Sequence, residues 1–138
     1  MRQPPIRRCF AALSVTAVLW LSACASYAPR VEPAVVAERI FCGLSIPGGG
    51  TVSQQELDAF VAEVVEPRFP QGFTIWRAKG HWRGGNEEVM VIEIVHPYDA
   101  RLDDAAREIA EEYRERFRQE AVLRVMMPAR MELVTEER

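Results

Sequence analysis

The stretch EEVMVIEIVH, residues 87–96, carries apolar side chains at both odd and even positions, and only Glu93 interrupts the run that begins at Val89. A strand with one face in water alternates apolar and polar residues, whereas a strand covered on both faces is apolar at both parities. The stretch therefore predicts a central strand of a sheet. Pro97 is expected to end it, because proline has no N–H to donate to a neighbouring strand.

The residues upstream predict two further strands. Residues 73–82 are expected to pair with residues 87–96 as a hairpin, since Arg83-Gly-Gly-Asn86 between them has the composition of a hairpin loop. Residues 39–46 carry an apolar side chain at every second position, and the glycines after Pro47 end this first strand. Its apolar face consists of Ile40, Cys42, Leu44 and Ile46.

A helix is predicted between the first two strands. Ser53 and Glu56 have the spacing of a capping box, in which each residue bonds the backbone of the other. The apolar residues that follow recur at helical spacing, so one face of the helix must be buried: Leu57, Phe60, Val61 and Val64. Pro67 is expected to stop the helix, because the residue before a proline disfavours the helical region.

Residues 102–118 predict a second helix, with Asp99 or Asp103 as its N-cap, and residues 121–134 predict a fourth strand. The expected buried stripe of this helix is Leu102, Ala106, Ile109, Tyr113 and Phe117. The order β-α-β-β-α-β is that of the split βαβ or ferredoxin-like unit. The predicted fold is therefore α+β, with two helices on one face of a four-stranded antiparallel sheet.

The uncovered face of such a sheet meets water, a ligand or another subunit. The predicted strands carry apolar residues of both parities, among them Phe41, Val91 and Val95, so this face is not expected to be fully polar. Contiguous exposed apolar surface usually marks an interaction site. We therefore predict a homodimer that packs sheet to sheet.

The N-terminus has the features of a secretory signal. Three arginines precede an apolar run over residues 10–20, and Leu21-Ser-Ala-Cys24 resembles the lipobox of bacterial lipoproteins. A transmembrane helix needs about 20 apolar residues, so this run is too short to remain as a membrane span. We expect cleavage before Cys24 and attachment of acyl chains such as palmitate to that cysteine. A leader that is cleaved elsewhere is the alternative.

These features divide the chain into a signal peptide over residues 1–23, a lipidated cysteine and tether over residues 24–37, and one domain over residues 38–138. In Gram-negative cells the residue after the lipidated cysteine influences sorting. Ala25 is not the aspartate that resembles an inner-membrane retention signal. We expect the chain in the Gram-negative cell envelope, at the periplasmic face of the outer membrane, with membrane lipid as its partner through Cys24.

The mature chain is acidic. The 138 residues include 17 basic and 20 acidic ones, and loss of the three leader arginines leaves a net charge of −6. Nucleic acid favours patches of Lys and Arg, so we expect no nucleic-acid partner. Cys42 is then the single remaining thiol and cannot form an internal disulfide. It is either buried as a small hydrophobic residue or a point of intermolecular pairing.

Several motifs resemble those of a bacterial family catalogued as domain of unknown function 3574, whose members are small and often lipidated exported proteins. The motifs are Phe41-Cys-Gly-Leu-Ser, Thr51-Val-Ser-Gln-Gln-Glu56, Pro67-Arg-Phe-Pro-Gln-Gly-Phe-Thr74, Gly80-His-Trp82, Val95-His-Pro97 and Tyr113 to Val125. The resemblance implies an exported α+β domain with no established activity. This chain has Arg118 where a family-like glycine is expected after Phe117, so the end of the second helix could differ here.

Few residues suggest chemistry. His81 and His96 are the two histidines, and neither a CxxC nor an HxxxH spacing occurs in the mature chain, so we predict no metal site and no cofactor. The sequence has no Gly-x-Ser-x-Gly motif, and we assign no catalytic residue. His96 is either a catalyst or a residue at a strand end that bonds the backbone.

The binding candidates gather on the second strand, where Trp76 and Trp82 lie near Arg77 and His81. Aromatic residues and arginine concentrate at binding sites, yet two tryptophans can equally form the core of a small domain. Strand parity separates these interpretations, because side chains toward the helices are core and side chains toward the open face belong to a site. Arg68 either pairs with a carboxylate or closes the end of the first helix.

Two function hypotheses remain. The first is a non-catalytic binding or interaction module of the cell envelope, whose partner is an envelope protein or a small ligand. The second is a cofactor-free enzyme or small-molecule carrier of the dimeric α+β barrel type, in which His96, His81 and Trp82 line a cavity between sheets. The second rests on analogy of fold.

Overall fold

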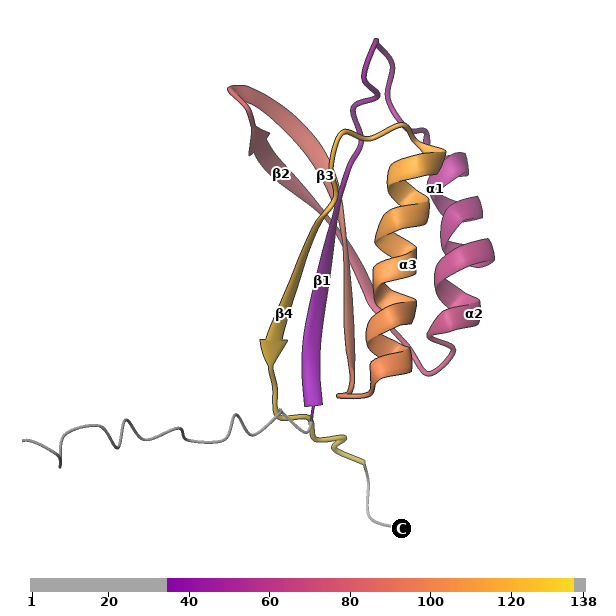
Figure 1. The fold of residues 1–138 in the computed structure, drawn as a ribbon, viewed down its shortest axis with the longest axis vertical. Helices are drawn as coiled ribbons and strands as arrows, with labels where there is room; N and C mark the ends of the chain where they lie inside the picture. The colour runs from indigo at the N-terminus through magenta and orange to yellow at the C-terminus, as the bar shows by residue number, and fades with distance from the viewer. Residues whose placement is uncertain (1–34, 136–138) are drawn as a thin grey trace, which may run out of the picture. The chain divides into compact units, whose positions relative to one another are not determined.

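A four-stranded antiparallel sheet, covered on one face by two helical segments, forms residues 35–135, which are the residues that the computed structural model describes (Figure 1). The strands are β1 (Val35–Gly43), β2 (Thr74–Trp82), β3 (Gly85–Pro97) and β4 (Leu123–Pro128), in the order β2-β3-β1-β4. The helical segments are α1 (Gln54–Phe60), η1 (Val61–Val65) and α2 (Glu66–Arg68), which run on without a break, and α3 (Ala100–Arg116). The predicted α+β ferredoxin-like arrangement is confirmed.

The predicted signal peptide, Cys24 and the first part of the predicted tether lie outside the described residues. Within residues 35–135, no helix combines the length and the apolar character needed to cross a membrane.

Strand register divides the sheet into a helix face and an open face. On β1 the even-numbered residues from Val36 to Cys42 are buried beneath the helices, while the odd-numbered ones are half-buried. Their partners Met90, Ile92 and Ile94 of β3 share the helix face, because residues directly opposite in an antiparallel pair point the same way. The main core therefore lies between the sheet and the helices, and Cys42 is buried within it.

The first helical segment begins as predicted and ends later than predicted. The capping box is present, since the backbone N–H of Ser53 donates to Glu56 Oε2 at 2.8 Å and the backbone N–H of Glu56 donates to Ser53 Oγ at 3.3 Å. The expected stop before Pro67 is wrong, because the helical segment runs to Arg68. The N–H of Glu66 donates to the carbonyl of Val61, five residues back, and this wider π-helical turn accommodates the proline ring that an α-helix excludes.

The first strand begins earlier than predicted. It starts at Val35 and takes in residues 35–37, which the sequence assigned to the tether. The reason is the length of β3, which runs to Pro97 and offers Val35 and Val36 a partner strand. The strand also ends at Gly43 instead of Ile46, because the chain enters a glycine-rich turn that Ser45 and Thr51 close with one bridge.

The hairpin loop is shorter than the predicted residues 83–86, and the last strand is shorter than the predicted residues 121–134. Only Arg83 and Gly84 form the turn, both with positive φ (46° and 87°), as a two-residue hairpin turn requires. β4 stops at Pro128 instead of extending to residue 134, because its partner β1 reaches no further than Val35.

Helix α3 runs from Ala100 with Asp99 as its N-cap, and its end shows how the chain accommodates Arg118. Arg118 has φ 53°, the left-handed conformation that glycine adopts without strain. The N–H of Gln119 donates to the carbonyl of Arg114 at 2.8 Å and that of Arg118 to Glu115 at 3.3 Å, which is a Schellman cap. The helix end therefore has the geometry of a glycine cap, and the suspected difference there is not found.

Replacing Arg118 with glycine should raise the free energy of unfolding by about 0.5–1 kcal/mol, because glycine adopts positive φ without the steric cost of a Cβ. Urea unfolding followed by circular dichroism measures the change. Arg114→Gly is the matched control on the exposed side of the same helix, and it should lose about 1 kcal/mol. Equal destabilisation by both changes would contradict the assignment of the cap.

Candidate functional site

A cleft of about 560 Å³ lies where β1 ends beside the tip of the β2–β3 hairpin and the loop between α3 and β4. Its walls are apolar and aromatic with a few polar groups, and the residues that matter below are Phe41, Gly43, His81, Trp82, Glu87 and Gln119. Small-molecule sites commonly have this character and volumes of roughly 300–1,000 Å³. The cleft is therefore the first candidate for a binding site.

The parity of β2 places both tryptophans on the open face. Trp76 lies opposite Val91 and Trp82 opposite Gly85, whereas Ile75 lies opposite the core residue Ile92. The interpretation of the tryptophans as core beneath the helices is therefore wrong. Trp82 is 51% exposed and lines the cleft.

His81 borders the same cleft at the end of the hairpin, and its ring is within hydrogen-bonding distance of a neighbouring side chain. Its Nδ1 lies 3.1 Å from Oδ1 of Asn86, the residue opposite it on β3. Both side chains are exposed. The predicted neighbours Trp82 and His81 thus meet at one site.

The middle of the open face is closed by the chain itself. Arg39 donates to Glu93 at 2.7 Å, and its guanidinium lies 5.8 Å from the ring centre of the half-buried Trp76. Val91, on the same face, has no exposed surface. Exposed apolar side chains remain toward the edges, including Val95 and Leu123. The sheet-to-sheet homodimer stays a prediction.

An ion pair joins two of the segments that frame the cleft. Arg83 in the hairpin turn pairs with Glu120 in the loop between α3 and β4. The same guanidinium lies 5.7 Å from the ring centre of Trp82. Both charged side chains are more than half exposed, so the pair contributes little to stability and does not lock the segments together.

Two of the sequence-predicted binding residues lie elsewhere. Arg77 belongs to the opposite parity of β2 and donates to Oε1 of Gln54 at 2.6 Å. Arg68 donates to the carbonyl of Val64 at 2.9 Å and pairs with Glu108 and Glu112 of α3 at 3.4 Å. Arg68 therefore fulfils both roles considered for it, because it satisfies a helix-end carbonyl and also meets carboxylates.

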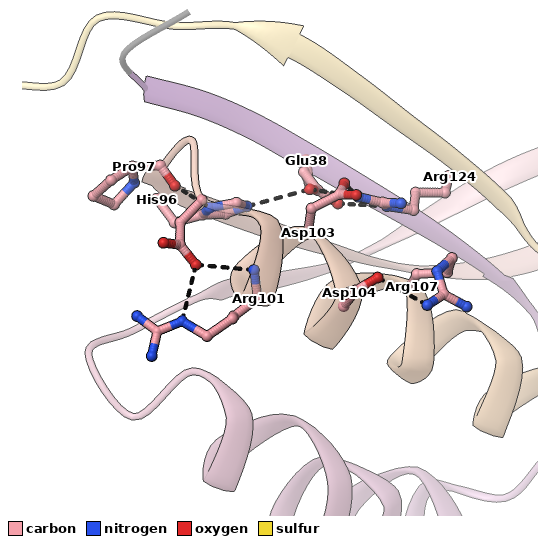
Figure 2. A network of polar contacts seen from close by, with 9 residues as sticks. Glu38, His96, Pro97, Arg101, Asp103, Asp104, Arg107 and Arg124 are labelled. Atoms are coloured by element: carbon pink, nitrogen blue, oxygen red, sulfur yellow. Dashed lines mark hydrogen bonds and ion pairs between the residues drawn. The ribbon is translucent and has the colours of Figure 1, made fainter. Parts of the chain in front are cut away.

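His96 belongs to a buried polar network on the helix face (Figure 2). Its Nδ1 lies 2.7 Å from the carbonyl oxygen of Pro97, as expected for a residue at a strand end, and its Nε2 lies 3.2 Å from Glu38 Oε1. Arg124 of β4 holds the same carboxylate with two hydrogen bonds, of 2.6 and 2.7 Å, and also pairs with Asp103 of α3. Glu38 is fully buried.

The network ties three strands and one helix together. Arg124 donates to Glu38 in the bidentate geometry that favours arginine over lysine, and these contacts raise the pKa of its guanidinium. The sequence patterns did not predict this network, although Glu38 lies on the buried side of β1 between Val36 and Ile40. A carboxylate at a core position was a signal that a partner would be needed.

The two histidines lie at opposite ends of β3, because His96 is opposite Val36 near the end of that strand, whereas His81 of β2 is opposite Asn86 beside the hairpin turn. His96 is buried beneath the helices, whereas His81 borders the cleft. The predicted cavity that His96, His81 and Trp82 would line together therefore does not exist within one chain. Among residues 35–135, no group of three or more potential metal ligands comes together.

Arg124→Met should lower the free energy of unfolding by about 3–5 kcal/mol, because it leaves the Glu38 carboxylate buried without its bidentate partner. Arg39→Met is the matched control, since it removes a partly exposed pair from the other face of the same sheet and should cost about 0–1 kcal/mol. Urea unfolding of both variants gives the comparison. A loss below 1 kcal/mol for Arg124→Met would contradict a structural role for the network.

Solved structures show where this fold occurs. A phage SAM lyase in complex with S-methyl-5′-thioadenosine is 21% identical over 75% of this chain and 88% of its own, with a TM-score of 0.50. The apo state of a phage SAM lyase is 21% identical over 67% and 78%, with a TM-score of 0.49. A designed protein with a ferredoxin fold is 14% identical over 75% and 93%, with a TM-score of 0.37. The likeness to the lyase complex shows the fold alone.

No curated protein matches the chain. The family model described as protein of unknown function (DUF3574) matches residues 37–133, nearly all of the described residues. The family resemblance inferred from the motifs is confirmed, and the chain belongs to the DUF3574 family.

Proposed function

We propose that this protein is a non-catalytic binding module of the cell envelope that takes a small molecule into the cleft beside Trp82. The observation that carries the proposal is the cleft itself, with about 560 Å³ of space between Phe41, Trp82 and the loop that precedes β4. Aromatic and apolar walls supply the area that binds a small molecule, and the few polar groups orient it.

The chemistry of the cleft supports binding more than catalysis. His81 is exposed and hydrogen-bonded to an amide, so no neighbouring carboxylate orients it as a base. Cys42 lies on the helix face, where burial raises the pKa of its thiol and keeps it protonated. Within the described residues, the cleft thus offers no activated nucleophile.

The envelope location is the second part of the proposal. It rests on the lipobox-like Leu21-Ser-Ala-Cys24 and on Ala25, which favours the outer membrane. Acyl chains on Cys24 would provide the two or more lipid signals that stable anchoring needs. The residues between Cys24 and β1, 25–34, span at most about 35 Å when extended, so the anchor would hold the start of β1 within that distance of the bilayer.

A cofactor-free enzyme that uses the same cleft is the second candidate. Glu87 places a carboxylate in the cleft, which is the observation that favours it. The phage SAM lyase shares the fold, so SAM and S-methyl-5′-thioadenosine are sensible first compounds to test. Chemical change of a compound that enters the cleft would separate this candidate from a binding module.

A large side chain that fills the cleft should prevent the ligand from binding. The full lipoprotein, released from membranes in mild detergent, should carry extra mass in native mass spectra, and Ala121→Trp should lose it because Ala121 lines the cleft. Ala62→Trp, on the exposed side of η1, is the control and should retain the mass. Wild-type protein without extra mass, or equal retention by both variants, would count against the cleft as the site.

Replacing Cys24 with serine should abolish lipid attachment, because the thiol is the acceptor of the diacylglyceryl group. Labelling of cells with radioactive palmitate should mark the wild-type protein and leave Cys24→Ser unlabelled. Cys42→Ser is the control, because Cys42 is buried in the domain and should not affect labelling. Unchanged label in Cys24→Ser would remove the anchor from the proposal.

A further inference from the structure

The floor of the cleft carries two acceptor oxygens that point at the same place. Gly43 lies at the end of β1 on the open face, and a Cβ there would collide with Glu87 Oε1 and lie 3.1 Å from Gln119 Oε1. The absence of a side chain at Gly43 therefore makes room for both groups. A carboxylate oxygen and an amide oxygen converge above one glycine.

Neither oxygen has a donor within the part of the chain that the structure describes. Glu87 takes part in no ion pair or side-chain hydrogen bond there. Gln119 is 8% exposed, and its Nε2 donates to the carbonyls of Ser45 and Phe117 at 2.9 and 3.3 Å, which fixes the amide with Oε1 toward the cleft. No fully buried side-chain oxygen among the described residues lacks a partner, so Oε1 of Gln119, which lines the cleft, is open to a donor from water or a ligand.

The remaining charges of the cleft leave Glu87 uncompensated. Glu120 also lines the cleft, but Arg83 pairs with it. Among residues 35–135, no Lys or Arg side chain lines the cleft. A cation that enters would find one free carboxylate beside apolar walls, whereas an anion would meet it as a like charge.

We infer that the cleft selects a small organic cation, a protonated amine attached to a flat apolar group. The ammonium N–H groups would donate to Glu87 and Gln119 above Gly43, and the apolar group would lie against Phe41 and Trp82. This inference rests on the proposed function, because it names the chemical class that the cleft binds. Two converging acceptors demand donors, so an ammonium fits better than a quaternary cation of equal charge.

Matched probes test the inference in the purified full lipoprotein by isothermal titration calorimetry. Two series, built on indole and on naphthalene, each compare an aminoethyl, a trimethylammonioethyl, a methyl and a carboxymethyl substituent. The aminoethyl compound should bind about tenfold or more tightly than the methyl compound, as a charge-assisted hydrogen bond predicts. The trimethylammonio compound should fall between these two, and the carboxymethyl compound should bind most weakly.

Two variants locate the effect. Glu87→Gln should abolish the preference for the aminoethyl compound and leave the affinity for the methyl compound unchanged. Gly43→Ala should also reduce the preference, because its Cβ displaces the Glu87 carboxylate, the far end of a flexible side chain. Glu88→Gln is the matched control, since Glu88 is exposed on the opposite parity of β3 and should keep the full preference.

The outcomes separate this inference from the proposed function. Equal binding of all four compounds in a series, or an unchanged preference in Glu87→Gln, would contradict the selection of a cation and leave the proposal of a binding cleft intact. Two other outcomes would contradict both the selection of a cation and the cleft as the binding site. These are probe binding that Ala121→Trp does not weaken, and a lack of binding by every probe in both series. Thermal unfolding of each variant confirms that lost binding is not lost folding.

Discussion

The buried carboxylate of Glu38 is the constraint on which the arrangement of the sheet depends. It lies on the helix face of β1, where it has no access to water and must be satisfied by partners from other elements. Arg124 meets it from β4, His96 from β3, and Asp103 of α3 completes the charge balance around Arg124. A shift of β4 by one residue would turn Arg124 to the open face and leave Glu38 unpaired, so the pair specifies the register of this edge strand.

The division into two faces determines where a ligand can enter. The helices cover the face that bears Glu38, and the long β3 strand carries apolar residues on both sides. On the open face Arg39, Glu93 and Trp76 cover the centre, so Val91 is buried without any helix above it. Among the described residues, the cleft on the open face lies toward the end of the sheet where β1 stops at Gly43 and the hairpin continues beyond it. The cleft is thus a consequence of unequal strand lengths.

The polar network around Glu38 and the polar groups of the cleft differ in how many of their hydrogen-bonding groups have partners. Around Glu38 each carboxylate has a cationic or hydrogen-bonding partner, which is what a structural role requires. In the cleft, Oε1 of Glu87 and Oε1 of Gln119 both lie close to Gly43, and neither accepts a hydrogen bond from a donor among residues 35–135. In a structural network the polar groups pair with one another, whereas in a binding site some polar groups stay free to bind the ligand.

Local patterns in the sequence determined the elements, their order and the fold. The capping box at Ser53, the apolar parity of β3 and the helical stripe that ends at Phe117 all act over a few residues, so they can be recognised without the fold. The structure alone decided which of these residues meet. Glu38 lies 86 residues from Arg124 and Gln119 lies 74 from Ser45, and no periodicity reports such contacts. His81 and His96 were grouped from the sequence, yet His81 lies opposite Asn86 at the hairpin end of β3 and His96 lies near the other end of that strand, because pairing between strands decides where along the sheet a residue lies.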